Sequence, residues 1–382
     1  MTADTQRHDK SPTRINPPFR ADHVGSLLRP KALLDLRYAA PEDRPSPEAL
    51  RVLEDQAIRD VVSFQESIGL QSVTDGEFRR ESWRSGFVSK VDGFERRPQR
   101  ATVGTARDAN GKTSLLADPP YAGRPLRRIR EIVTDDFIFL RSLTTRTPKV
   151  TLPAPSYMHF FLGEDSFSPS AYDNSSAYFD ALVAIYVEEL SSLAANGCTY
   201  VQLDEVVLPA LCDPTIRAAV EARGDRPEAL VDSYVGIVNR IVASRPKELT
   251  IAMHFCRGNS MGRWLADGGY DYISEKVLGG VAVDALFLEY DTPRAGSFAP
   301  LAHVAPDKTV VLGLVSTKTG ELESVDTLKR RIDEAARYIP LERLCLSPQC
   351  GFASRDKGNP IALDDQKRKL ERVVTVARDV WG

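Results

Sequence analysis

The chain has 382 residues, of which 42% are hydrophobic, and its 50 basic and 53 acidic residues give a net charge of −3. This near balance argues against a nucleic-acid partner or an anionic membrane surface, and no apolar run reaches the roughly 18 residues that a membrane span needs. Five cysteines in a chain of this length make no disulfide framework, so a reducing compartment such as the cytoplasm is expected.

Short apolar runs and helical patterns alternate along most of the chain. Residues 1–17 are polar, contain proline and lack the hydrophobic core of a signal peptide, so they predict a disordered leader on a cytosolic protein. Eight runs predict strands, at residues 20–28, 72–78, 149–156, 199–207, 249–256, 285–291, 309–316 and 344–350. Helices are predicted between and after them, notably at residues 47–68, 175–195, 227–244, 324–338 and 363–380.

Eight strands with intervening helices predict a fold of the α/β class, a single (β/α)8 barrel over residues 18–382, with its active site at the carboxyl ends of the strands. Polar residues stand at the end of every predicted strand, from His23 and Ser26 on the first to Gln349 and Cys350 on the eighth. A doubly wound open sheet is the competing fold. It does not explain why polar groups recur at every strand end.

Residues 79–130 are too long for a minimal connection and form a predicted insertion after the second strand. The segment is rich in Arg, Gly and Pro, and it is interpreted as a lid, a hairpin or an oligomer contact. An oligomer contact would make the protein a homo-oligomer. Its arginines are more often a solvated surface than a clamp for an anion.

The run His254-Phe255-Cys256, at the end of the fifth predicted strand, is the strongest chemical signal in the chain. Residues i and i+2 of a strand point to the same side, with Cα atoms about 7 Å apart, so both side chains can bind one metal ion. Taken singly, such residues are more often part of a core. Together with Cys350 and Glu289, at two further strand ends, they predict a Zn²⁺ site with four ligands. The remaining cysteines, Cys198, Cys212 and Cys345, lack such positions and are predicted to be structural.

The predicted ligand set indicates the reaction. Two thiolates and a carboxylate outweigh the charge of Zn²⁺, so the centre is better suited to hold a substrate thiol as a thiolate than to activate water. A free thiol with a pKa of about 8.5 is only a few per cent ionised at neutral pH. The hard carboxylate of Glu289 is the ligand that a soft sulfur is expected to displace. The predicted reaction is alkylation of a thiol to a thioether.

Six segments at the strand ends carry a resemblance to a known family: HVGSLLRP, TDGEF, QLDEVVLPA, MHFCRGN, FLEYD and SPQCGF. In this order they resemble the catalytic half of cobalamin-independent methionine synthase and, more closely, its short single-barrel bacterial relatives. The resemblance covers residues 18–382. It implies a zinc-dependent methyltransferase that makes methionine from homocysteine, with zinc on His254, Cys256, Glu289 and Cys350.

The resemblance also implies that Ser26, Glu77 and Asp204 hold the amino-acid end of homocysteine. Two carboxylates suit an α-ammonium group, and a hydroxyl with its backbone suits a carboxylate. Glu205 and Tyr157, which also stand at strand ends, complete the predicted substrate site. For Asp204 and Glu205 the alternative is a charge pair at a helix N-terminus.

Two departures from the family concern the second substrate. The additional N-terminal barrel of the full-length enzyme has no counterpart here, and the folate-stacking tryptophan is not evident near Tyr157, His159 and Phe160. Ser316-Thr317-Lys318 stands in place of the family's D-x-H-S segment, whose histidine is assigned to proton delivery. Lys318 falls near that histidine, so Lys318 and Asp204 are the predicted catalytic residues.

The predicted partners are a small-molecule thiol and a methyl donor, either a methyl-folate or a methyl-corrinoid on a corrinoid protein. One alternative keeps the zinc chemistry but uses an epoxide, as in the epoxyalkane–coenzyme M transferases, where arginines hold the sulfonate of the thiol. Glu77 and Asp204 favour an amino-acid thiol over this alternative. Another alternative is a non-catalytic zinc-binding barrel, which leaves the polar strand ends far from the metal unexplained.

Overall fold

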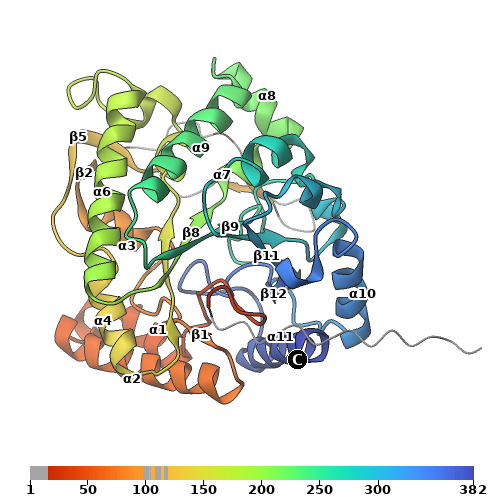
Figure 1. The fold of residues 1–382 in the computed structure, drawn as a ribbon. Coiled ribbons are helices and arrows are strands. Elements are labelled where there is room, and N and C mark those ends of the chain that lie inside the picture. The colour runs from red at the N-terminus through yellow and green to blue at the C-terminus, as the bar shows by residue number, and fades with distance from the viewer. Residues whose placement is uncertain (1–15, 96, 98–102, 104, 108–112, 116–118) are drawn as a thin grey trace, which may run out of the picture.

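The computed structural model describes residues 16–95, 97, 103, 105–107, 113–115 and 119–382, so residues 1–15 of the predicted leader lie outside the described residues. Six parallel strands form the central sheet, hydrogen-bonded in the order β12-β11-β10-β9-β8-β7 (Figure 1). They are β7 (Val150–Pro153), β8 (Tyr200–Glu205), β9 (Thr250–Phe255), β10 (Ala285–Glu289), β11 (Thr309–Val315) and β12 (Leu344–Pro348). Each lies within its predicted range.

Two short pairings complete the barrel. β1 (Ser72–Val73) pairs in parallel with β6 (Thr147–Pro148), which leads directly into β7. On the other side, Ala21 forms a parallel bridge with Leu346 of β12. With the segment around Ala21 as the first strand and β1 as the second, eight parallel strands make the predicted (β/α)8 barrel. The fold class is confirmed, and the open-sheet alternative is wrong.

The first two strands are much shorter than predicted because the backbone turns early. Gly25 has a φ of 141°, Gly76 a φ of 66°, and Glu77 a φ of 61°. These are left-handed conformations that end an extended strand, and for a residue other than glycine they are uncommon. The two segments still meet, because the Leu27 N–H donates to the Gly76 carbonyl at 3.0 Å.

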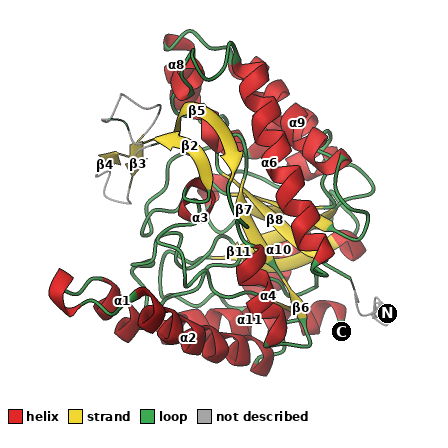
Figure 2. Ribbon diagram, turned by 90° about the vertical axis from the view of Figure 1, so that its left-hand side faces the viewer, coloured by secondary structure: helices red, strands yellow, loops and turns green. Residues whose placement is uncertain are grey.

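Helices surround the strands (Figure 2), and all five predicted helices are present. They are α2 (Pro47–Ser67), α6 (Ser175–Ala195), α9 (Pro227–Ala243), α10 (Val325–Ala335) and α11 (Leu363–Trp381). Ser46, Asn174 and Ser324 cap α2, α6 and α10 by accepting a backbone hydrogen bond. Further α-helices are α1 (Lys31–Arg37), α3 (Ser85–Val88), α4 (Thr134–Ser142), α5 (Tyr157–Phe160), α7 (Val207–Ala210) and α8 (Pro214–Ala222). Short 3-10 helices lie at Pro41–Asp43, Gly163–Ser166, Tyr270–Ile273, Pro293–Ala295, Ala299–His303 and Leu341–Arg343, with a π-helix at Ser274–Leu278.

The strands are buried on both faces, which explains their continuous apolar sequences. One face points into the barrel, where a separate apolar cluster combines residues of the first strand and of β8 to β12. This cluster consists of Val24, Tyr200, Ala252, Ala285, Phe287, Val311 and Cys345. Residues of the opposite face, such as Leu203, Met253 and Leu288, belong to the large core that includes the helices. The barrel interior is thus filled, and the site is confined to its mouth.

The predicted insertion contains a small antiparallel sheet of its own. α3 is followed by β2 (Val91–Glu95), which pairs antiparallel with β5 (Tyr121–Arg128). Between them, β3 (Thr105–Arg107) pairs antiparallel with β4 (Thr113–Leu115). Figure 2 shows β3 and β4 lying beyond the ends of β2 and β5. Within residues 79–130 the described parts include this hairpin, and its role as a lid or an oligomer contact stays a prediction.

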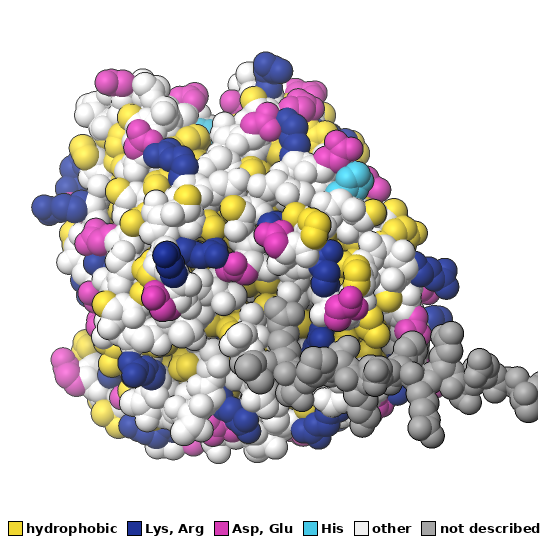
Figure 3. Space-filling view, in the orientation of Figure 1, with side chains coloured by type: hydrophobic (Ala, Val, Ile, Leu, Met, Phe, Trp, Pro, Cys, Tyr) yellow, Lys and Arg dark blue, Asp and Glu magenta, His cyan; other side chains and the backbone are white. Residues whose placement is uncertain are grey.

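The surface carries both signs of charge. On the face shown in Figure 3, Lys and Arg side chains are interspersed with Asp and Glu side chains, in keeping with the balanced composition. Among the described residues, no helix combines the length and the apolarity that crossing a bilayer requires.

A buried ion pair joins the first strands of the barrel, where few backbone hydrogen bonds connect neighbouring strands. Lys149 Nζ lies 2.9 Å from Asp22 Oδ1, and both side chains are fully buried. Asp22 also accepts hydrogen bonds from Ser72 Oγ at 2.8 Å and from Tyr200 Oη at 2.9 Å. The first four strands of the barrel (the segment around Ala21, β1, β6–β7 and β8) therefore meet at the Asp22 carboxylate. Breaking a buried pair from one side is costly, because the remaining charge has no partner.

We predict that Lys149→Met lowers the free energy of unfolding by about 3–5 kcal/mol, since it leaves the Asp22 carboxylate buried without its cation. Urea unfolding followed by circular dichroism measures this change. The double variant Lys149→Met/Asp22→Asn removes the stranded charge and is expected to recover part of the loss. Equal stability of Lys149→Met and the wild type would contradict the role of the pair.

Candidate active site

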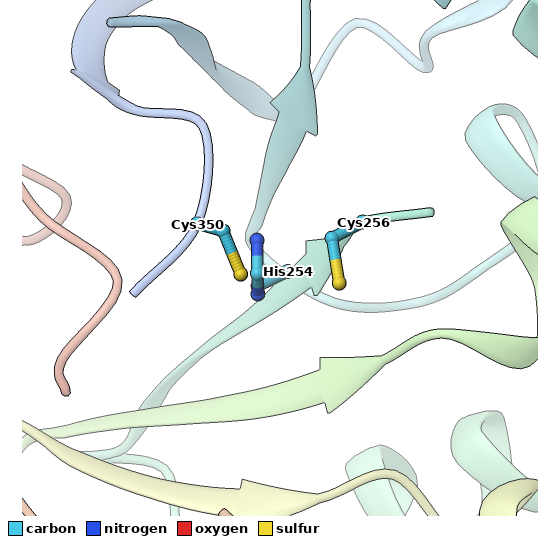
Figure 4. Close-up of side chains that lie close together, drawn as sticks. All are labelled: His254, Cys256 and Cys350. Atoms are coloured by element: carbon cyan, nitrogen blue, oxygen red, sulfur yellow. The ribbon is translucent and has the colours of Figure 1, made fainter. Parts of the chain in front are cut away.

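The predicted cysteine and histidine ligands converge at the mouth of the barrel. His254 belongs to β9, Cys256 follows that strand, and Cys350 follows β12 (Figure 4). The three ligand atoms all lie within 4.8 Å of one another. The exposed fractions of these residues are only 2%, 9% and 4%, so their polar atoms face one another in a largely dry environment.

The pKa values of the three groups depend on one another. A hydrogen bond with Cys256 lowers the pKa of the Cys350 thiol well below its usual value, against burial and with help from His254. The same hydrogen bond, together with burial, raises the pKa of Cys256. Burial lowers the pKa of His254, but hydrogen bonds with Asp204 and Cys350 outweigh it and bring the value to about 10.

This donor set fits a bound metal ion. Imidazole and thiolate are the ligands that zinc prefers, and three protein ligands leave a position for a substrate. Ligands must be deprotonated to bind a metal, so protons on His254 and Cys256, whose pKa values are raised, would be released on uptake. The arrangement is therefore suited to a divalent cation of borderline or soft character.

A chain of hydrogen bonds orients the His254 ring from below. Asp204 of β8 stands opposite His254 of β9 in the strand register, and its Oδ1 lies 3.3 Å from His254 Nδ1. Gln202 Nε2 donates to the same Oδ1 at 2.7 Å, and Gln202 Oε1 accepts from Lys149 at 3.2 Å. Such partners fix the tautomer and angle of a ligating imidazole. The network extends from the buried ion pair to the cluster of His254, Cys256 and Cys350.

Glu289, the predicted fourth ligand, lies outside this cluster of three, although it lies close enough to raise the pKa of Cys256. Its side chain is fully buried at the end of β10. Oε2 accepts the Arg257 backbone N–H at 2.7 Å, and Oε1 accepts from Arg294 at 2.5 Å and from Lys318 at 3.2 Å. Burial raises the pKa of Glu289, but Lys318, Arg294 and Arg257 outweigh it and bring the value to about 2.

Lys318 is nearly buried and is not part of the cleft lining. Its Nζ donates to Glu289 Oε1 and to Asp291 Oδ2, at 3.2 and 3.1 Å. Burial lowers the pKa of Lys318, but these two carboxylates more than compensate and raise it above its usual value. A lysine with this environment holds its proton tightly. The geometry thus favours a role through Glu289 over the predicted delivery of a proton to a substrate.

A cleft of about 1160 Å³ opens above the cluster and brings the predicted substrate residues together. Its lining includes Ser26, Glu77, Tyr157, Asp204 and Glu205 beside His254, Cys256 and Cys350. Of the sequence-predicted residues, Glu289 and Lys318 are not part of this lining. The volume is large enough for two small molecules or for one with a cofactor-sized partner.

Glu77 has the environment expected of a group that binds a cation. Thr151 Oγ1 donates to Glu77 Oε1 at 2.9 Å, whereas Oε2 is buried without a hydrogen-bond partner. Burial, with the negative charge of Asp204, raises the pKa of Glu77 to about 7, against the opposite effect of Arg80. An α-ammonium group between Glu77 and Asp204 would satisfy both carboxylates.

Ser26 lies against the loop that carries Cys350. The Ala353 N–H donates to Ser26 Oγ at 3.4 Å, and the Phe352 N–H donates to the Ser26 carbonyl at 2.9 Å. A Cβ at Gly351 would lie 1.9 Å from Ser26 Oγ, so only glycine permits this approach. The Ser26 hydroxyl and the Cys350 sulfur are thereby held on the same side of the cleft.

Glu205 and Tyr157 have local partners. Glu205 accepts from Ser156 Oγ at 2.5 Å and from the backbone N–H groups of Val207 and Leu208 at 2.5 and 2.9 Å. These contacts match the alternative of a charge at a helix N-terminus. Tyr157 packs edge-on against Trp83, with ring centroids 4.7 Å apart, and forms an aromatic wall of the cleft.

Comparisons with known proteins decide the family. Residues 23–378 match the family model described as "Cobalamin-independent synthase, Catalytic domain". The chain belongs to the cobalamin-independent methionine synthase family. It is 39% identical over 374 residues to the uncharacterized protein YxjH of Bacillus subtilis, covering 95% of each chain. It is 26% identical to the methionine synthase of Pyrococcus abyssi, covering 87% of this chain and 86% of that one.

A solved structure supports the same conclusion. A Listeria monocytogenes protein assigned to the vitamin-B12 independent methionine synthases superposes with a TM-score of 0.74 at 31% identity. The match covers 97% of this chain and 100% of the other. The relatedness suggested by the six strand-end segments is thus confirmed over nearly the whole length. The chain is a member of a methyltransferase family.

Several residues at the site of this methionine synthase relative escaped the sequence reasoning. Trp83 and Arg84, near the start of the insertion, line the cleft. The position of Trp83 shortly after a predicted strand could have indicated that it belongs to the site. Asn259 Nδ2 donates to the Gly351 carbonyl at 3.1 Å and so links the loops that follow β9 and β12. Arg294 lies in a short loop helix after β10, and nothing in its local sequence indicates its contact with Glu289.

We predict that Cys256→Ala and Cys350→Ala each lose most of the bound metal, because each removes one of three clustered ligands. Cys198→Ala and Cys212→Ala serve as matched controls. Both residues are buried, and burial raises their pKa to about 12, as for ordinary core thiols. Metal content per chain by inductively coupled plasma mass spectrometry measures the difference. Equal retention in all four variants would contradict the ligand assignment.

Proposed function

We propose that the chain methylates the sulfur of homocysteine to give methionine, with zinc bound by His254, Cys256 and Cys350 and with Glu289 as the fourth ligand. One observation carries this proposal above all. Two thiols and an imidazole cluster within 4.8 Å at the base of the cleft that also contains Glu77 and Asp204. The family relationship supports the same activity, since relatives are named methionine synthase.

The chemistry of the sulfur follows from the ligand set. A bound zinc ion would keep the substrate sulfur as a thiolate at neutral pH, the form that attacks an alkyl group. His254 is held by Asp204, and Cys350 is held by the loop that packs on Ser26. These contacts preorganise the ligands and leave little freedom to be lost on binding. In the transfer, a sulfur–methyl bond forms, and the electron pair of the broken bond stays with the donor.

The amino-acid end of homocysteine is proposed to lie between the two carboxylates. Glu77 Oε2 has no hydrogen-bond partner within the described residues and lies 4.0 Å from Arg80 Nη1. The Asp204 side chain is 13% exposed toward the cleft. The substrate carboxylate is placed near Ser26 and Gly351. This pair of acidic groups would repel the sulfonate of coenzyme M, and an open cleft of this size has no use in a non-catalytic zinc barrel.

The donor binds in the outer part of the cleft, beside Trp83 and Tyr157. A methyl-folate and a methyl-corrinoid differ in what their departure requires. A folate nitrogen needs a proton as it leaves, whereas a cobalt(I) corrinoid is a stable anion. Lys318, near the family's proton-delivering histidine, already donates to two carboxylates. A corrinoid, carried by a protein partner, is therefore the proposed donor. A homo-oligomer through residues 79–130 also stays a proposal.

The proposed ammonium site can be tested at Asp204. Asp204→Asn is expected to weaken homocysteine binding by roughly 1.5–3 kcal/mol, the range for a hydrogen bond to a charged group. Titration calorimetry with the zinc-loaded chain measures the affinity. The amide can still accept from His254 Nδ1, so zinc content should not change. Glu205→Gln is the neighbouring control and is expected to leave affinity within a few-fold. An unchanged affinity in Asp204→Asn would place the amino group elsewhere.

Methyl transfer to homocysteine can be tested directly with different donors. The zinc-loaded chain, supplied with homocysteine, is expected to form methionine faster with methylcobalamin than with monoglutamyl methyl-folate, because the corrinoid leaves without protonation. Liquid chromatography with mass spectrometry of the products distinguishes methionine from a hydroxyalkyl thioether when an epoxide is offered instead. Reactions with Cys350→Ala correct for uncatalysed transfer. Faster turnover with methyl-folate would overturn the donor assignment, and absence of methionine with every donor would overturn the proposed function.

A further inference from the structure

The carboxylate of Glu289 is surrounded by cations although it is also the predicted fourth metal ligand. Oε1 accepts from the Arg294 guanidinium at 2.5 Å and from Lys318 Nζ at 3.2 Å. Oε2 accepts the Arg257 N–H at 2.7 Å. The side chains of Arg294 and Lys318 are only 12% and 8% exposed, and Glu289 is fully buried. Solvent therefore screens these contacts weakly.

Each of these contacts competes with metal binding for the same oxygen electrons. A carboxylate offers about four lone-pair positions in all, and three are used here. Hydrogen bonds from charged groups are also stronger than those between neutral groups. The competition is greatest at Oε1, which faces two full positive charges. Such a carboxylate is a weaker ligand than a free one would be.

Lys318 donates from Nζ to the carboxylates of Glu289 and Asp291, and its charge also helps to lower the pKa of Cys350. It does not line the cleft. Arg294, by contrast, also donates to the Ala266 carbonyl and stacks over Trp264 at 4.8 Å. Lys318 is thus the member of this pair whose described Nζ hydrogen bonds go to carboxylates alone.

We propose that Lys318 and Arg294 hold Glu289 by Oε1 and thereby keep one coordination position accessible to the substrate thiol. This inference rests on the proposed function and adds a positioning role for two residues that never touch the substrate. Lys318 then favours thiol binding by weakening the ligand that the thiol must replace. Loss of Lys318 strengthens the hold of Glu289 on the metal at the expense of the thiol.

The test is a double-variant cycle on the full chain. Lys318→Met keeps most of the unbranched side chain and removes its charge, Lys318→Arg keeps the charge, and Glu289→Gln replaces the carboxylate by a neutral amide. Zinc affinity is measured by competition with a chromophoric chelator, and homocysteine affinity by calorimetry on zinc-loaded protein. For Lys318→Met we expect tighter zinc and weaker homocysteine binding, each on the order of ten-fold, the size typical of groups in contact. Lys318→Arg should stay near the wild type.

The cycle separates this role from a structural one. In the Glu289→Gln background, Lys318→Met should no longer change homocysteine affinity, since the competing carboxylate is gone. If the loss of charge leaves Asp291 unpaired and unfolds the chain, Lys318→Met/Asp291→Asn replaces the single variant with the same expectations. Unchanged affinities in a folded Lys318→Met chain, or an effect that persists with Glu289→Gln, would overturn the inference alone. A wild-type chain that binds neither zinc nor homocysteine would overturn the proposed function as well.

Discussion

Closure of the barrel is the constraint on which the site depends. β9 and β12 are separated in the sheet by β10 and β11, and at about 4.8 Å per strand a flat sheet would hold them roughly 14 Å apart with parallel side chains. In a closed barrel the inward side chains point toward a common axis. His254 and Cys256 from one side and Cys350 from the other therefore meet within 4.8 Å. No local structure could bring them together.

The closure is itself held by polar contacts at its weakest point. The first strand contributes a single bridge, and the second has two residues. The Asp22–Lys149 ion pair joins the strands there, where few backbone hydrogen bonds connect them. Through Gln202 the same network reaches Asp204 and His254. Stability and ligand orientation thus share one set of buried groups, which explains why charges are present in a barrel interior that is otherwise apolar.

The charges around the cluster are arranged so that sulfur is favoured over oxygen. Cations surround the Glu289 carboxylate, whereas Cys350 and Cys256 have mainly each other and His254. In the same cleft, Glu77 and Asp204, the latter in contact with His254, supply carboxylates where an ammonium group would lie. One cleft thus contains a soft region for a thiol and a hard, acidic region for an amine. An amino-acid thiol carries the two matching groups, a soft sulfur and a charged amine.

Much of this was predictable from the sequence, for physical reasons. Long helices such as α2 and α6 have strong caps and periodicity, and buried parallel strands have continuous apolar runs. The pair His254 and Cys256 follows from the two-residue repeat of a strand. Contacts between distant loops were not predictable: nothing local indicates that Arg294 and Lys318 meet Glu289. The short first strands were missed because positive φ at Gly25 and Glu77 ends them.

The most direct test of the account is zinc K-edge X-ray absorption of the zinc-loaded chain, with and without homocysteine. We predict two sulfur ligands and one imidazole in the free protein. With homocysteine the fit should require three sulfurs and one fewer oxygen, because the substrate binds through its thiolate. A sulfur number that stays at two in the presence of saturating homocysteine would contradict the central claim.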